Sequence, residues 1–84
     1  MIKKYKTDAI RYLFLPNIQE LVAIHVIRTK RKTIELSCAP YLMEVYIKGP
    51  KELAADTVFD IVKKNVSNIT QSILNYYKMK AKIR

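Results

Sequence analysis

The stretch from Leu42 to Tyr77 constrains the fold more than any other part of the chain. Its first residues alternate between apolar and polar side chains, which is the period of a half-buried strand. Gly49 permits a sharp corner, and Pro50 suits a first helical position, where its missing N–H costs no hydrogen bond. Apolar residues then recur every three or four positions in one helical stripe: Val58, Ile61, Val62, Val66, Ile69, Ile73 and Tyr76. The pattern predicts a strand that leads directly into one long amphipathic helix.

The N-terminal half contains a second strand signal followed by an ambiguous segment. We predict a strand over Ala9–Leu15, which Pro16 ends because proline cannot donate a hydrogen bond within a sheet. Asn17–Thr29 begins with an asparagine followed three places later by a glutamate, which resembles a helix capping box and predicts a helix. The β-branched residues of this segment disfavour a helix, so a strand from Leu21 to Arg28 is the alternative.

A third strand and a short turn complete the predicted fold. Thr33–Cys38 alternates as a strand, and residues 39–41 turn the chain into the next one, so the two form an antiparallel hairpin. The predicted order is β-α-β-β-α, an α+β fold whose three-stranded antiparallel sheet is covered on one face by two helices. If Asn17–Thr29 is extended, a four-stranded sheet under one helix results. We expect one small domain, residues 1–84, with a basic N-terminal lead-in and a basic C-terminal tail.

Positive charge is the main compositional clue to function. Sixteen Lys and Arg against seven Asp and Glu give a formal charge of +9. This charge favours a polyanionic partner, with RNA or DNA as the first candidate and an anionic membrane surface as the second. Basic residues gather before the hairpin and at the C-terminus, where Tyr76 and Tyr77 can stack on unpaired bases. A solvated, frayed helix end is the alternative for the C-terminal group. The predicted nucleic-acid-binding residues are Arg28, Lys30, Arg31, Lys32, Lys78, Lys80, Lys82 and Arg84.

A polar stretch occupies the middle of the predicted long helix. It is too polar for a helix stabilised by intrinsic propensity alone. It therefore predicts a helix face that either contacts a partner through hydrogen bonds or stays hydrated. The predicted partner-interface residues are Lys63, Lys64, Ser67, Asn68 and Gln71.

The sequence offers little for catalysis. His25, the single histidine, lies in an apolar run, where a tucked or half-buried side chain is expected rather than a base or a ligand. Cys38, the single cysteine, excludes an internal disulfide, and we expect a buried, inert thiol. No Gly-rich phosphate loop is present. We therefore expect no enzyme, catalytic residue, metal or cofactor. Without a long apolar run, we expect a cytoplasmic protein with no membrane partner.

A resemblance to a known family rests on the residues from Lys32 to Ile73, KTIELSCAPYLMEVYIKGPKELAADTVFDIVKKNVSNITQSI. They are similar to the small dimerising subunit of the KEOPS complex, in which a hairpin leads through a short polar corner into a helix. That helix carries small and basic residues and ends near an Asn-Ser pair. Val62-Lys63 and Ser67-Asn68 stand near those places, with the serine and asparagine in reversed order. The N-terminal half fits the family's first strand and helix by hydrophobic pattern.

The resemblance implies a non-catalytic accessory subunit of a tRNA-modifying complex. Members of the family pair as homodimers or with a diverged relative. They bind the ATP-binding catalytic subunit that attaches threonylcarbamoyl to an adenosine of tRNA, and they help to hold the tRNA. The alternative is a stand-alone small basic DNA- or RNA-binding protein, although the chain lacks the GxxG loop of one common RNA-binding module.

Overall fold

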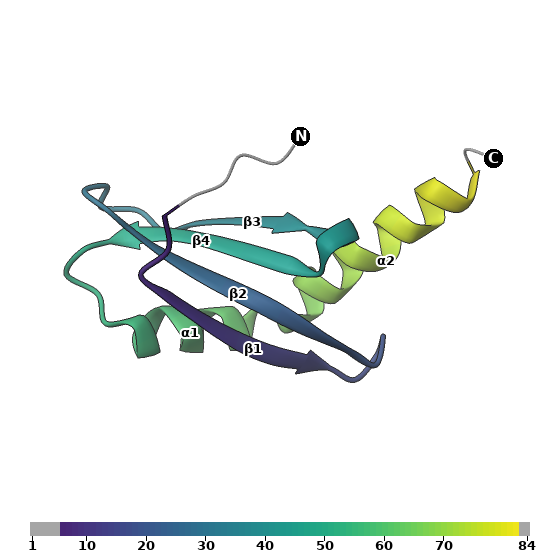
Figure 1. Ribbon diagram of the computed structural model, residues 1–84, viewed down its shortest axis with the longest axis horizontal. Helices are drawn as coiled ribbons and strands as arrows, with labels where there is room; N and C mark the ends of the chain where they lie inside the picture. Colours follow the sequence, from purple (N-terminus) through teal and green to yellow (C-terminus); the bar gives the residue numbers. More distant parts are fainter. Residues whose placement is uncertain (1–5, 83–84) are drawn as a thin grey trace.

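A four-stranded sheet forms one layer of the molecule, and two helices form the other (Figure 1). The structure is a computed structural model that describes residues 6–82. It confirms the α+β class. In chain order the elements are β1 (Ala9–Leu15), β2 (Glu20–Thr29), β3 (Glu35–Ala39), the short 3-10 helix η1 (Pro40–Leu42), β4 (Glu44–Pro50), α1 (Ala55–Lys64) and α2 (Val66–Lys82).

The predicted helix over Asn17–Thr29 is wrong, because most of this segment is the central strand β2. Leu15 pairs with Glu20, so a four-residue turn joins β1 to β2. Within this turn the Ile18 N–H donates to the Leu15 carbonyl at 3.2 Å, and Gln19 adopts a left-handed φ of 52°. The β-branched residues then alternate along a strand, the geometry that suits their side chains. The capping-box pattern marks the hairpin turn and not a helix start.

The sheet has four strands and not the predicted three, and the element order is β-β-β-β-α-α. Its spatial order is β1-β2-β4-β3. The predicted antiparallel hairpin of β3 and β4 is confirmed, and β1 also pairs antiparallel with β2. The expectation of a wholly antiparallel sheet is wrong, since β2 and β4 run parallel. The connection between β2 and β3 carries the chain past β4, which leaves β3 at the far edge of the sheet.

The corner at Gly49-Pro50 lies inside the sheet. Both residues are buried at the end of β4, opposite Arg28 and Thr29 of β2, and α1 begins only at Ala55. Pro50 therefore does not occupy the first position of a helix, as the sequence pattern predicted. It tolerates this place because it is the last residue of its strand, where a missing donor interrupts little of the ladder.

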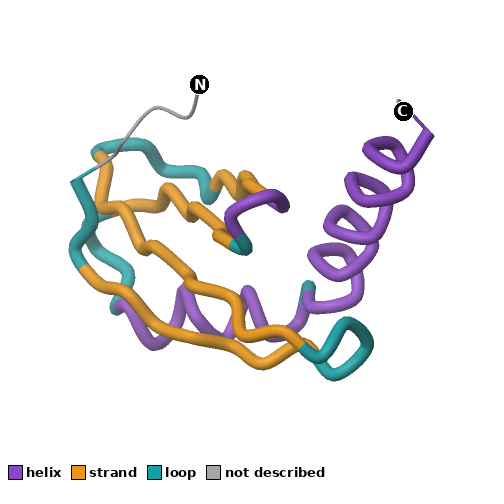
Figure 2. Tube along the Cα trace, turned by 45° about the vertical axis from the view of Figure 1, so that its right-hand side comes forward, coloured by secondary structure: helices purple, strands orange, loops and turns teal. Residues whose placement is uncertain are grey.

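The predicted single long helix is broken at Asn65. The Asn65 N–H donates to the Val62 carbonyl at 2.8 Å, and its side-chain Nδ2 donates to the Ile61 carbonyl at 2.8 Å. Its own carbonyl accepts the N–H of Ile69 at 3.1 Å. One asparagine thus ends α1 and begins α2, because its short amide competes with the regular helical hydrogen bonds. The break changes the direction of the chain, and the last turns of α2 extend beyond the sheet (Figure 2).

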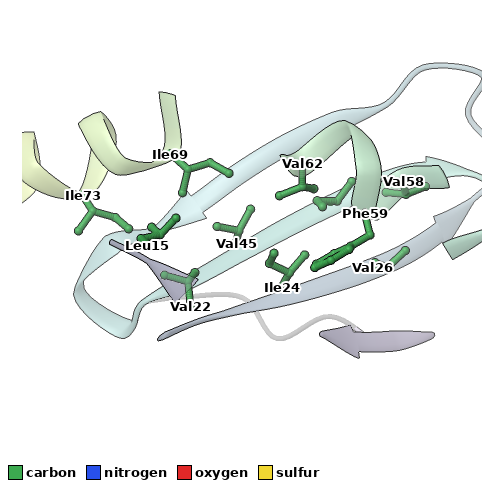
Figure 3. Close-up of a cluster of buried hydrophobic side chains, with 11 residues drawn as sticks. Leu15, Val22, Ile24, Val26, Val45, Val58, Phe59, Val62, Ile69 and Ile73 are labelled. Atoms are coloured by element: carbon green, nitrogen blue, oxygen red, sulfur yellow. The ribbon is translucent and has the colours of Figure 1, made fainter. Parts of the chain in front are cut away.

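The core lies between the inner face of the sheet and the helical stripe that the sequence predicted (Figure 3). Ile24 and Val26 of β2 and Ile47 of β4 have 0% exposed surface. Full burial of such side chains stabilises the fold by about 1.5–3 kcal/mol each. The cluster comprises Leu15, Val22, Ile24, Val26, Val45, Ile47, Val58, Phe59, Val62, Ile69 and Ile73. Neither helix packs on the outer face of the sheet.

Candidate nucleic-acid interface

Three tyrosine rings meet where η1 packs against the C-terminal half of α2. The ring centroids of Tyr41 and Tyr76 are 5.8 Å apart, and those of Tyr76 and Tyr77 are 5.7 Å apart. The Tyr77 hydroxyl also donates to Met43 Sδ at 3.7 Å. Tyr41 and Tyr77 keep 46% and 41% of their surfaces exposed, so their rings are accessible from solvent.

A tight turn brings Tyr41 to this position. Pro40 stands at the start of η1, and Met43 ends it in a left-handed conformation with a φ of 53°. The Met43 N–H donates back to the Pro40 carbonyl at 3.0 Å. This turn places the Tyr41 ring in contact with Tyr76 of α2. Tyr76 and Tyr77 could be identified from the sequence, but Tyr41 could not, because its only sequence signal is a turn between two strands.

Two exposed lysines follow these rings on a helix that has no carboxylate. Lys80 comes one turn after Tyr76 and Tyr77 and shares their side of α2, whereas Lys78 points to another side of the helix. The sequence contains no Asp or Glu after Asp60, so no acidic side chain of α2 offsets their charge. Cations near the C-terminal end also suit the negative end of the helix dipole. We call these five residues the tyrosine–lysine patch: Tyr41, Tyr76, Tyr77, Lys78 and Lys80.

The other two residues of the predicted C-terminal basic group lie at or beyond the end of the described chain. Lys82 is the last residue of α2, and its side chain is not described. Arg84 lies outside the described residues. Their predicted contacts with nucleic acid stay predictions.

The other predicted basic cluster lies at the opposite end of the molecule. This basic turn (residues 28–32) joins β2 to β3, whereas the end of α2 lies at the other end of the 44 Å long axis (Figure 1). The Arg28 guanidinium donates to the Pro50 carbonyl at 3.4 Å, and Arg31 forms an ion pair with Glu35. Lys30 and Lys32 are exposed and form no ion pair within residues 6–82. The structure therefore does not bring the two basic clusters together.

The predicted partner-interface residues surround the break between α1 and α2. All five are exposed: Lys63, Lys64, Ser67, Asn68 and Gln71. The Lys63 ammonium lies 5.1 Å from the centroid of the Phe59 ring, and Gln71 Nε2 donates to Asn75 Oδ1 at 2.9 Å. Exposure leaves this surface accessible to a partner or to water, so the interface stays a prediction.

His25 is half-buried, as expected from the sequence, whereas Cys38 is half-buried and not buried as expected. His25 is half-buried on the outer sheet face, with Nε2 3.2 Å from Glu44 Oε1 and its ring stacked on Tyr46 at 4.6 Å. The Tyr46 hydroxyl donates to the second oxygen of the same carboxylate at 2.8 Å. Cys38 is half-buried, and burial raises the pKa of its thiol, which disfavours the nucleophilic thiolate.

No group of three or more His, Cys, Asp and Glu residues is placed to hold a metal ion within residues 6–82. In the same range, neither helix has the length and apolar character needed to cross a membrane.

A scan against protein-family models and searches among curated proteins and solved structures find no match to this chain. Function is therefore inferred from the chain's own residues.

Proposed function

We propose that this protein is a non-catalytic accessory protein that binds RNA through the tyrosine–lysine patch. The observation that carries the proposal is the contact of three tyrosine rings at the end of α2, which also carries two exposed lysines and no carboxylate. Stacking of a base on an aromatic ring contributes roughly 1–3 kcal/mol and tolerates any base. The lysines add phosphate contacts, which give affinity without sequence preference.

Unpaired nucleotides fit this patch better than an intact duplex does. A tyrosine ring stacks on the flat face of a base, and in a duplex those faces are covered by neighbouring bases. Proteins that recognise RNA by stacking accordingly bind loops, bulges and ends. The loops and the 3′ end of a tRNA meet this requirement, which agrees with the tRNA partner that the resemblance implies.

The particular assembly that we propose is a KEOPS-like complex that forms threonylcarbamoyladenosine in tRNA. In it the chain acts in the cytoplasm as a homodimer or as a heterodimer with a paralogue, beside the ATP-binding catalytic subunit. Support comes from Lys32–Ile73, where the β3–β4 hairpin precedes the helices as it does in the family. The family's first helix has no counterpart, because β2 occupies those residues, so this support comes from the C-terminal half alone.

Binding of a labelled single-stranded RNA, followed by fluorescence anisotropy over a range of salt, tests the patch. Each phosphate contact in a single strand contributes about 0.7 to the slope of log affinity against log salt. Replacing Lys78 and Lys80 together by Ala should therefore flatten the slope by about 1.4. Tyr41→Ala and Tyr77→Ala should each weaken binding roughly 5- to 150-fold while leaving the slope nearly unchanged.

A matched control removes the same charge from the other end of the molecule. The pair Lys30→Ala and Lys32→Ala lies in the basic turn and should leave both the slope and the affinity close to wild type. If the α2 variant keeps the wild-type slope, the patch does not contact phosphates and the proposal is wrong. A larger loss from the turn variant would move the RNA contact to the basic turn and would equally contradict the proposal.

Affinity purification of the tagged chain from its native cells, followed by mass spectrometry, tests the assembly. The KEOPS-like role predicts co-purification of an ATP-binding catalytic subunit together with tRNA. The alternative function, a stand-alone DNA- or RNA-binding protein, is favoured by a patch that lies entirely within one chain. Recovery of nucleic acid without any stoichiometric protein partner would support that alternative and would exclude the complex.

A further inference from the structure

The two exposed rings of the tyrosine–lysine patch lie close together but in different planes. The ring planes of Tyr41 and Tyr76 are inclined by 39°, and those of Tyr76 and Tyr77 by 61°. Because these two angles differ, the planes of Tyr41 and Tyr77 cannot be parallel. Their centroids are separated by no more than the sum of the two centroid distances, a span that neighbouring nucleotides of one extended strand cover. One strand can therefore place a base on each outer ring.

The middle ring does not add an equivalent stacking surface. Tyr76 is half-buried and has the other two rings as its neighbours, whereas Tyr41 and Tyr77 are both exposed. The Tyr77 hydroxyl donates to Met43 Sδ, and the Tyr41 ring contacts Tyr76, so each outer ring has a contact that favours its observed orientation. The patch thus presents two separate stacking surfaces with different inclinations.

Bases that stack on the two outer rings cannot also stack on each other. A base lies parallel to the ring on which it stacks, so bases on Tyr41 and Tyr77 take up the different inclinations of these rings. RNA therefore binds both rings only after losing the stacking between the nucleotides concerned. The loss costs most in adenosine runs, whose large purine rings overlap well, and least in uridine runs.

The larger ring system of a purine does not offset this cost. The tyrosine side chain has a single six-membered ring, so it overlaps about as much of a uracil as of an adenine. The two bases thus gain similar stacking free energy on tyrosine, whereas adenine gives up more stacking with its neighbours in the strand. Stacking strength and backbone flexibility are the usual origin of sequence preferences in proteins that bind single strands.

We propose that the tyrosine–lysine patch selects weakly stacked, uridine-rich single strands over adenosine-rich strands, through two bases splayed apart on Tyr41 and Tyr77. This inference rests on the proposed function and names the class of RNA that the patch binds. The preference requires no hydrogen bond to a base edge. Lys80 shares the side of α2 that carries the tyrosines and contacts a phosphate of either strand, so it adds affinity without contributing to the preference.

Fluorescence anisotropy with labelled oligouridylate and oligoadenylate of about eight nucleotides, at one salt concentration, tests this inference. The wild-type chain should bind oligouridylate roughly three- to tenfold more tightly. Tyr41→Ala leaves a single outer ring, which can extend a base stack at the end of a strand without disrupting it. The ratio of the two affinities should therefore fall towards one. Tyr77→Ala, a second variant in case the first does not fold, should lower the ratio in the same way.

Tyr12→Ala is the matched control, because Tyr12 is an exposed tyrosine of β1 outside the patch. It should keep the wild-type ratio. The circular dichroism band of stacked adenines gives an independent readout with the wild-type chain. Saturating protein should reduce this band in oligoadenylate, because two of its bases leave the stack.

Three results would overturn the inference. They are equal or tighter binding of oligoadenylate by the wild-type chain, a wild-type ratio in both patch variants, and an undiminished adenine band at saturation. Failure of the proposed function gives a different result. In that case the patch variants, including the replacement of Lys78 and Lys80, bind both strands as the wild-type chain does.

Discussion

Individual polar residues of this chain mainly stabilise the fold. The Glu44 carboxylate contacts both His25 and the hydroxyl of Tyr46, so three groups that can carry out chemistry elsewhere satisfy one another here. Arg28 and Arg31 are likewise engaged, with the Pro50 carbonyl and with Glu35. The exposed lysines of α2 differ, because the helix that carries them has no acidic residue. This contrast at single residues supports the proposed contact of α2 with RNA.

The thiol of Cys38 offers a residue-scale prediction. Burial raises its pKa, so the neutral thiol is favoured in the folded state. Alkylation of the folded protein should therefore reach its half-maximal rate at a higher pH than alkylation of the urea-unfolded chain. Burial of the neutral thiol therefore contributes fully to the free energy of unfolding below the pKa of the unfolded thiol. This contribution is lost as pH rises through the folded pKa. Equal midpoints for the folded and unfolded chains would contradict this assignment.

At the scale of elements, local patterns predicted most strands but not their assembly. The alternation along β1, β3 and β4 and the apolar stripe of the helices were sufficient to predict those elements. β2 was ambiguous, because Pro16 and Asn17 suit a hairpin turn as well as a helix start. The break at Asn65 was missed because one asparagine rarely interrupts a stripe that continues on both sides. The parallel pairing of β2 with β4 depends on contacts that no local pattern specifies.

The candidate site likewise combines residues that are neighbours in the sequence with one residue that only the fold brings close. Tyr76, Tyr77 and the lysines after them are neighbours in the sequence, so they could be predicted as a group. Tyr41 joins them only because η1 packs on α2, a contact between residues far apart in the chain. Both basic clusters could be identified from charge alone, but charge does not specify how far apart they lie. The topology places them at opposite ends of the molecule.

The turn between β1 and β2 gives an element-scale prediction. Gln19 is exposed and has a left-handed φ of 52°, a conformation that costs a non-glycine residue roughly 1–2 kcal/mol. Gln19→Gly relieves this strain and should raise the free energy of unfolding by up to about 1 kcal/mol in urea titrations. Met43→Gly is the comparison, because Met43 has a similar φ of 53° but its sulfur accepts a hydrogen bond from the Tyr77 hydroxyl, which glycine would lose. It should give no gain, and a loss of stability in Gln19→Gly would contradict the explanation.

At the scale of the whole molecule, the tyrosine–lysine patch lies where α2 extends past the sheet, and the basic turn lies at the other end of the long axis (Figures 1 and 2). The homodimer proposed above would present two tyrosine–lysine patches. Paired sites on one RNA raise the overall affinity when the RNA spans them.

The central claim, that RNA contacts the tyrosine–lysine patch, is tested most directly by ultraviolet cross-linking of a single-stranded RNA to the wild-type chain. Mass spectrometry then identifies the peptides that carry a nucleotide. The predicted adducts fall on Tyr41, Tyr76 and Tyr77. Adducts on Tyr12 and Phe14 instead would show that RNA binds the outer face of the sheet, and that result would contradict the account.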